Sequence, residues 1–120
     1  MPAYVDGFLL SLPKRKIPVY RRISRRAGKI WREYGALEYR ECVGDDLKTK
    51  MGRPFAKAAS VKSGETVVFS WIVYRSRADR DRVNRKVMKD PRMLKMMKEP
   101  MPFDVKRMSF GGFRVIVDLA

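Results

Sequence analysis

Residues 65–74, ETVVFSWIVY, carry the strongest strand signal in the chain. Successive side chains of a strand point to opposite faces. One face of this strand then carries Val67, Phe69, Trp71 and Val73, and the other carries Val68, Ile72 and Tyr74. Since both faces are apolar, the rest of the molecule has to cover both of them.

The segments around this strand alternate between strand and helix patterns. Residues 4–12 are apolar and β-prone, and residues 36–43 alternate as a second strand. Between them, residues 18–34 repeat apolar side chains at helical steps, from Pro18 to a stop at Gly35. Downstream, Ser76 and Asp79 form a capping pattern for a second helix that ends near residue 90, and residues 113–119 predict a last strand.

Two connecting segments show neither the helical nor the strand periodicity of apolar residues. Residues 47–64 predict a long loop, a feature that is uncommon in compact domains and is often functional. Residues 93–102 contain four methionines and two prolines, and they predict an irregular or short helical connection.

The order strand, helix, strand, strand, helix, strand predicts an α+β fold of the ferredoxin-like type, as one domain over residues 1–120. Both helices would lie on one face of an antiparallel sheet. Such a sheet usually has a polar second face, but here that face is apolar. Burying about 400 Å² of it would contribute on the order of 10 kcal/mol before the costs of association. The sequence therefore predicts a homodimer that forms sheet to sheet.

The composition is that of a globular intracellular protein. Hydrophobic residues make up 45% and charged residues 34%, and no run of about 18 apolar residues is present to span a membrane. Residues 1–12 show no signal-peptide pattern, and Cys42 is the single cysteine, as expected in a reducing compartment. We therefore expect a cytoplasmic protein.

The chain contains no histidine. This excludes a His-ligated haem, His/Cys zinc sites, Ser-His-Asp and Cys-His nucleophiles and a histidine base. Any catalysis must depend on carboxylates, Tyr, Lys, Arg, Cys42 or a bound molecule. The sequence points to no particular cofactor and no metal site, since adjacent Asp45 and Asp46 are better explained as turn residues.

The net charge of +15 predicts attraction to anions, including nucleic acid and phosphorylated metabolites. The basic residues concentrate on the outer faces of the two predicted helices. RNA-recognition domains share this strand order, but they expose aromatic residues within a glycine-containing basic motif that residues 65–74 lack. A nonspecific nucleic-acid binder is thus the least favoured of three hypotheses.

Several side chains are candidates for chemistry. Asp6 lies within an apolar strand, and Glu38 and Glu41 lie near the end of the second strand. In a shared dry cavity one such carboxyl could act as an acid or base, although pairing with the many arginines is the simpler explanation of these carboxylates. Cys42 is a possible reactive thiolate and more simply a small core residue.

Candidate ligand-binding residues lie in two places. Phe69 and Trp71 could form a flat aromatic wall for a ring-shaped ligand, or could serve only in packing. Arg107 could clamp a carboxylate or phosphate, or could pair with Asp104 or with the other subunit.

Four segments together resemble the YbaA-like family of small bacterial proteins (domain of unknown function 1428). They are YVDGF at 4–8, GALEYRECVGDD at 35–46, GETVVFSWIVYRSRADRDRVNRKVM at 64–88 and MPFDVKRMSFGGFRVIVDL at 101–119. The resemblance implies a dimeric α/β barrel made of two ferredoxin-like sheets, and it implies no particular activity. The strongly basic first helix departs from that family pattern.

The leading hypothesis is therefore a homodimer that binds or transforms a small aromatic or acidic metabolite. The alternative is a noncatalytic interaction or stress-related module.

Overall fold

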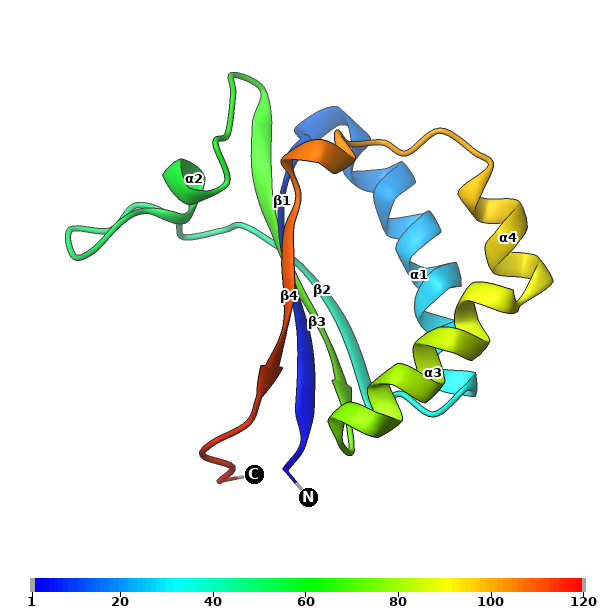
Figure 1. Ribbon diagram of the computed structural model, residues 1–120. Coiled ribbons are helices and arrows are strands. Elements are labelled where there is room, and N and C mark those ends of the chain that lie inside the picture. The colour runs from blue at the N-terminus through cyan, green and yellow to red at the C-terminus, as the bar shows by residue number, and fades with distance from the viewer. Residues whose placement is uncertain (1, 120) are drawn as a thin grey trace.

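The computed structural model describes residues 2–119 and shows one four-stranded antiparallel sheet with helices packed on it (Figure 1). The sheet order is β2-β3-β1-β4, which is the ferredoxin-like arrangement predicted from the sequence. The strands are β1 (Tyr4–Pro13), β2 (Glu38–Val43), β3 (Glu65–Tyr74) and β4 (Ser109–Arg114). The doubly apolar β3 lies inside the sheet between β1 and β2.

Three helices cover one face of the sheet: α1 (Ile17–Glu33), α3 (Arg77–Lys89) and α4 (Pro91–Met97) (Figure 1). Short 3₁₀ turns, η1 (Lys14–Lys16) and η2 (Val105–Arg107), join them to the strands. The predicted cap of α3 is confirmed, since the Ser76 hydroxyl accepts the Asp79 amide at 3.1 Å. The methionine-rich connection begins as the regular helix α4, which Asp90 caps by accepting the Arg92 amide at 2.8 Å.

The core lies between the sheet and this helix layer. Its larger cluster joins Ile72 and Tyr74 of β3 to Val83 and Val87 of α3, all nearly inaccessible to solvent. A second cluster is made of Leu10, Leu12, Tyr20 and Val68. Asn84 connects three elements, because its side-chain oxygen accepts hydrogen bonds from Trp31 at 3.1 Å and from Tyr74 at 3.2 Å.

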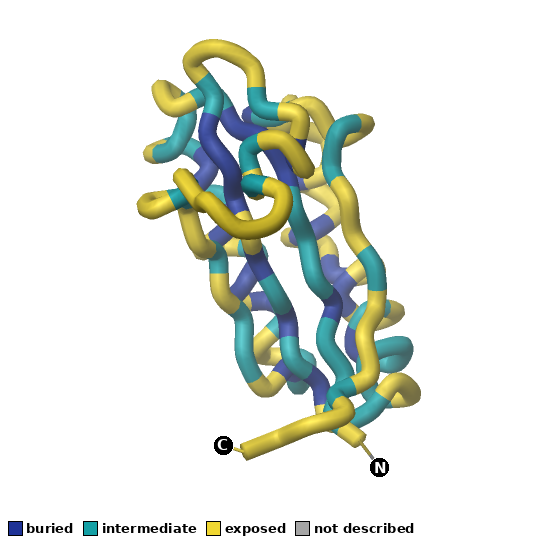
Figure 2. The backbone as a smooth tube through the Cα atoms, turned by 90° about the vertical axis from the view of Figure 1, so that its left-hand side faces the viewer, coloured by how far each residue is buried: buried dark blue, intermediate teal, exposed yellow. Residues whose placement is uncertain are grey.

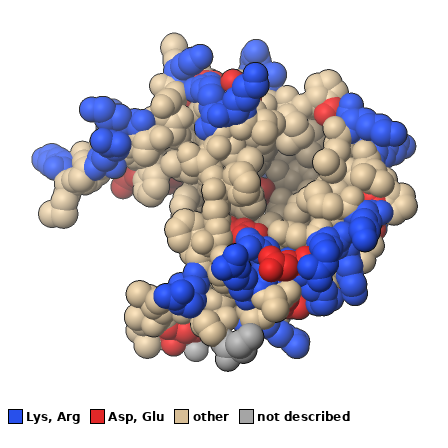
Figure 3. Space-filling model, viewed as in Figure 1, with Lys and Arg blue, Asp and Glu red and all other residues tan. Residues whose placement is uncertain are grey.

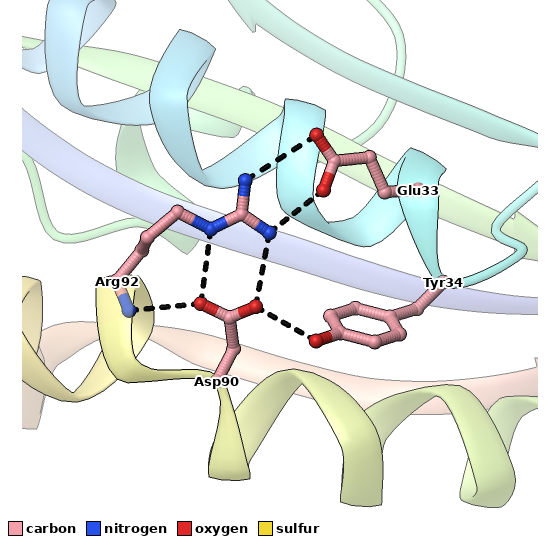
Figure 4. Close-up of polar contacts among 4 residues, drawn as sticks. All are labelled: Glu33, Tyr34, Asp90 and Arg92. Atoms are coloured by element: carbon pink, nitrogen blue, oxygen red, sulfur yellow. Dashed lines mark hydrogen bonds and ion pairs between the residues drawn. The ribbon is translucent and has the colours of Figure 1, made fainter.

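An ion-pair network fixes the end of α1 to the junction between α3 and α4 (Figure 4). Arg92 donates to Glu33 at 2.7 Å and to Asp90 at 2.9 Å, and the Tyr34 hydroxyl donates to Asp90 at 2.7 Å. Asp90 is buried, whereas Glu33 and Arg92 are exposed. The Arg92 guanidinium holds the pKa of Asp90 below its usual range, with help from Tyr34.

The opposite face of the sheet carries no long helix, and it is apolar as predicted. The segment between β2 and β3 crosses one end of this face, as the exposed loop in Figure 2 shows. Part of the segment forms a short helix, α2 (Phe55–Ala58), which corrects the prediction of an unbroken loop over residues 47–64. Phe55 packs against Phe69 with ring centroids 5.9 Å apart, and this contact explains why the segment folds back on the sheet.

The prediction of the last strand was wrong in its bounds. β4 runs from Ser109 to Arg114 and pairs with β1, and its last partner is Tyr4, the first residue of β1. Beyond that point the chain has no strand left to pair with. Residues 115–119 are therefore outside the sheet despite their β-branched side chains, and Ile116, Val117 and Leu119 are at least 70% exposed.

Within residues 2–119, no helix is both long enough and apolar enough to cross a membrane.

Candidate ligand-binding site

A groove of about 760 Å³ lies between α1 and the β2 side of the sheet. This volume is typical of sites for small molecules. Figure 3, which views the molecule from the β4 side, shows a hollow between sheet and helices at the sheet edge opposite to this groove, with mostly uncharged side chains around it. Apolar side chains from three strands and from the start of α1 line the groove: Leu12, Ile17, Val43 and Val68.

One row of α1 faces into this groove at four-residue steps: Tyr20, Ser24 and Gly28. The presence of glycine at position 28 has a steric explanation, because a Cβ atom there would lie 2.5 Å from the Tyr39 ring. The missing side chain lets α1 approach β2 closely. This approach brings the tyrosine of the helix and that of the strand to one carboxylate.

That carboxylate belongs to Glu41. The Tyr20 hydroxyl donates to its Oε2 at 2.7 Å, and the Tyr39 hydroxyl donates to its Oε1 at 2.9 Å. No cation within residues 2–119 forms an ion pair with Glu41. Burial raises the pKa of Glu41, an effect that the tyrosine hydrogen bonds oppose. Burial and the nearby carboxylate in turn raise the pKa of both tyrosines.

A smaller pocket of about 150 Å³ lies deeper between α1 and the sheet. Tyr20, Ser24, Tyr39 and Glu41 line both the groove and this pocket. The pocket is otherwise mostly apolar, with Met101, Phe103 and Met108 among its lining residues. Glu41 therefore offers a single strong acceptor between two apolar spaces, which suits a ligand with a hydroxyl or amine donor.

The structure separates the predicted carboxylates. Asp6 is on the helix-facing side of the sheet, as Glu41 is, but it forms a buried ion pair with Arg80 at 2.6 Å and lines neither space. Arg80 also stacks over the Tyr4 ring at 4.9 Å. Asp6 and Glu41 thus have different partners, and they do not form a carboxyl pair.

The remaining β2 and β3 candidates lie toward the helix-free side. Trp71 donates its ring N–H to Glu38 at 2.8 Å and packs against Phe69 with centroids 5.6 Å apart. Both aromatic residues line a shallow hollow of about 610 Å³ on that face. Cys42 is not the small core residue that the sequence favoured: it is exposed on the edge strand, it borders the groove, and its register with Phe69 turns its side chain to the helix-free face.

Arg107 and Asp104 lie away from the groove. Arg107 donates to Glu65 at 2.8 Å and to the Ser60 carbonyl at 2.6 Å, and it holds the pKa of Glu65 at about 2. Asp104 accepts the Lys106 amide at 3.0 Å at the start of η2. In the described part of the chain, no three acidic or cysteine side chains cluster as metal ligands would.

Sequence reasoning did not identify Tyr20, Tyr39 and Ser24 as site residues. A usable signal was present, since the alternation in residues 36–43 places Glu41 on the same side as Tyr39. A carboxylate on the face that a strand turns toward a helix has to find donors there.

Comparison with known proteins agrees with this architecture. Residues 3–105 match the model of a protein family described as "Protein of unknown function (DUF1428)". The chain is 44% identical over 115 residues to "Uncharacterized protein YbaA" of Escherichia coli K12, with 96% of this chain and 97% of that protein covered. The chain belongs to the DUF1428 family. The resemblance noted in the sequence is thereby confirmed, and a YbaA of Shigella flexneri is similar to this DUF1428 chain at the same identity.

Solved structures similar to this DUF1428 chain share its fold at low identity. SnoaB, a cofactor-independent oxygenase from Streptomyces nogalater, has a TM-score of 0.63 at 10% identity, covering 99% of this chain and 98% of that one. A dimeric ferredoxin-like protein from an uncultured marine organism has a TM-score of 0.58 at 11% identity, covering 99% and 100%. The ferredoxin-like α+β class is therefore established for this chain.

Proposed function

We propose that this protein is a homodimer that binds an apolar or aromatic small molecule between α1 and the sheet, with Glu41 as the polar anchor of the ligand. The observation that carries the proposal is a half-buried carboxylate at the wall of a groove of about 760 Å³. Tyr20 and Tyr39 hold this carboxylate, and no cation of residues 2–119 forms an ion pair with it.

Such an arrangement is costly for folding. An ionised carboxylate taken out of water without a cation loses more hydration than two hydroxyl donors return. Apolar residues of similar size would fill the space at no such cost. Groups with perturbed pKa values in concave sites often serve in binding or proton transfer. Glu41 fits this pattern better than any other carboxylate of the described residues, since Asp6, Asp90 and Glu65 each have an arginine partner.

The geometry sets the chemistry that Glu41 can perform. Both carboxylate oxygens already accept a tyrosine hydroxyl, and each keeps a further lone pair for a ligand donor. Because burial raises its pKa, Glu41 is also a better proton acceptor than an exposed carboxylate. A ligand hydroxyl that binds here would therefore be polarised toward loss of its proton.

The homodimer is supported by the surface that a single chain leaves open. The chain exposes 8771 Å², whereas a compact monomer of its mass of 14.0 kDa exposes about 6,700 Å². Its radius of gyration of 15.1 Å also exceeds the roughly 13.6 Å typical of this length. Exposed apolar side chains on or beside the helix-free face contribute to the excess: Phe69, Phe113, Ile116, Val117 and Leu119.

A second copy is the occupant that fits this face. The face is apolar and carries no long helix, and the apolar side chains of Ile116, Val117 and Leu119 beside it are strongly exposed. We therefore assign Phe69 and Trp71 to the subunit interface rather than to the wall of the α1 groove.

Binding at the groove can be tested with naphthol, an uncharged aromatic compound with one hydroxyl donor. We expect saturable binding by fluorescence, together with slower alkylation by iodoacetamide of the thiol in Cys42→Ser/Val43→Cys, since Val43 lines the groove on the same strand face as Tyr39 and Glu41. Glu41→Leu should weaken binding about tenfold, the scale of a lost hydrogen bond to a charged group.

The matched control places the thiol outside the groove, on α4, in the double variant Cys42→Ser/Lys95→Cys. Its alkylation rate should not respond to naphthol. Unchanged alkylation of Cys42→Ser/Val43→Cys at saturating naphthol would contradict the assignment of the groove as the binding site.

A further inference from the structure

A row of cations follows the groove along α1: Arg21, Arg25, Lys29 and Arg32. The first three each come one residue after a member of the inward row Tyr20, Ser24 and Gly28, so the helix turns them to the rim beside that row. From first to last the row extends about 16 Å at 1.5 Å per residue. It therefore runs along most of one groove wall.

Most of these cations have no counter-charge in the part of the chain that the structure describes. Within residues 2–119, no ion pair or side-chain hydrogen bond involves Arg21, Arg25 or Lys29. Arg32 differs, because its guanidinium donates to the carbonyls of Ala36 and Leu37. Glu33, the other acidic residue that lines the groove, is already bonded to Arg92. Three positive charges thus face one apolar groove without a partner.

We infer that the natural ligand of this groove is an amphipathic anion, which has an apolar or aromatic body, a hydroxyl donor directed to Glu41, and a carboxylate or phosphate at Arg21, Arg25 and Lys29. This inference deepens the proposed function and rests on it. The apolar floor fits the body of such a molecule, and the two polar features fit its two ends.

The charges also fix the direction in which the molecule binds. An anionic group next to Glu41 would meet a carboxylate in a partly dry space, where repulsion is strong. At the rim the same group gains charge-assisted hydrogen bonds, and an arginine can donate two of them to one carboxylate or phosphate. A ligand without the anion would lose these contacts and would keep only the contacts at the floor and at Glu41.

Three probes with one naphthalene body test this inference: naphthol, a hydroxynaphthoate and a hydroxynaphthyl phosphate. The anionic probes should bind the native protein at least about tenfold more tightly than naphthol at physiological ionic strength. Comparing the hydroxynaphthoate with the hydroxynaphthyl phosphate shows which of the two anions the rim prefers. Tighter binding of either probe than of naphthol supports the inference.

Two double variants of the same helix provide the contrast. Arg21→Gln/Arg25→Gln removes two groove cations, and Arg22→Gln/Arg26→Gln removes two exposed cations that line neither the groove nor the deeper pocket. Both lower the net charge equally. The first should weaken binding of the anionic probes about tenfold, and the second less than about twofold. Neither should change naphthol binding by more than about twofold.

Two results would overturn the inference while leaving the proposed function intact. One is anionic probes that bind no better than naphthol although naphthol still protects the thiol of Cys42→Ser/Val43→Cys from alkylation. The other is an equal loss in both double variants, which would show a response to overall charge, as expected for a nonspecific binder of nucleic acid. If no probe protects that thiol, the proposed function itself fails.

Discussion

Glu41 has opposite effects on ligand binding and on the stability of the fold: its carboxylate offers an acceptor to a ligand, and the same carboxylate is costly for folding. Its carboxylate is half-buried between two tyrosines without an ion-pair partner among residues 2–119, and the loss of hydration raises its pKa above the usual 4.5. A raised carboxyl pKa means that folding favours the protonated form. The folded state is therefore most stabilised below the unfolded-state pKa, and it loses that contribution as the pH rises through the folded-state value.

Glu41→Gln should consequently make the protein more stable at neutral pH. The amide is uncharged and of the same size, so the variant avoids the cost of burying a charge while one oxygen still accepts a tyrosine hydroxyl. We expect a gain of about 1 kcal/mol at neutral pH by urea denaturation. The gain should shrink below pH 4.5, where the native side chain is also protonated.

Glu65→Gln is the matched control for this experiment. Arg107 holds the pKa of Glu65 at about 2, so its contribution has the opposite sign. That contribution is present above the ordinary pKa of 4.5 and is lost as the pH falls toward 2. Glu65→Gln should therefore destabilise the protein at neutral pH. Loss of stability in Glu41→Gln as well would show that the tyrosine hydrogen bonds outweigh the cost of burial.

For single residues, the sequence predicts the strand face on which a side chain lies better than it predicts the hydrogen-bond partner of that side chain. Alternation correctly placed Phe69 and Trp71 on one side of β3, and it placed Glu41 on the side of Tyr39. The hydrogen bond from Tyr20 depends on how closely α1 approaches β2. That approach depends on the absence of a side chain at Gly28, a tertiary effect that no local pattern reports.

At the scale of elements, Asp90 joins two helices and the end of a third. It ends α3, caps α4, and connects both to the end of α1 through Arg92 and Tyr34 (Figure 4). Asp90→Asn should lower Tm by several degrees at neutral pH, because one buried side chain loses its charge toward Arg92. The pKa of folded Asp90 lies below its ordinary 3.8, so the difference from the native protein should be full above pH 3.8 and should shrink as the pH falls from 3.8 toward the folded-state pKa.

The control lies in the same network. Glu33 also bonds to Arg92, but its side chain is 56% exposed, and exposed ion pairs contribute little. Glu33→Gln should leave Tm nearly unchanged. Equal shifts in Asp90→Asn and Glu33→Gln would mean that the network acts only through its surface charges.

Helices and strands that pack or pair within this chain were predictable from the sequence. The end of the last predicted strand, which lies beyond its neighbour β1, was not. Helices α1 and α3 and strands β1 and β3 follow their sequence patterns within a few residues. Residues 115–119 have the composition of a strand but lie beyond the start of β1, the only neighbour of β4. Strand propensity needs a partner for hydrogen bonding, and the local sequence does not show where that partner ends.

At the scale of the whole molecule, the face that the helices leave bare has to be covered by something apolar. Its side chains are aromatic and β-branched, which is the composition of an interface core rather than of a solvated surface. We therefore expect a dimer of twice the chain mass of 14.0 kDa by light scattering at micromolar concentration.

A single charge on this face should separate the subunits. Phe113 is 62% exposed and pairs with Val5 across β1 and β4, on the side away from the helices. In Phe113→Lys the monomer loses little packing, whereas a dimer would have to bury an ammonium group among aromatic side chains at a cost of several kcal/mol. Light scattering should then give the mass of one chain. Leu94→Lys, at a residue of α4 that is 46% exposed, introduces the same charge into the helix layer and should stay dimeric. A native protein that already has the mass of one chain, or a dimer that survives Phe113→Lys, would contradict assembly through this face.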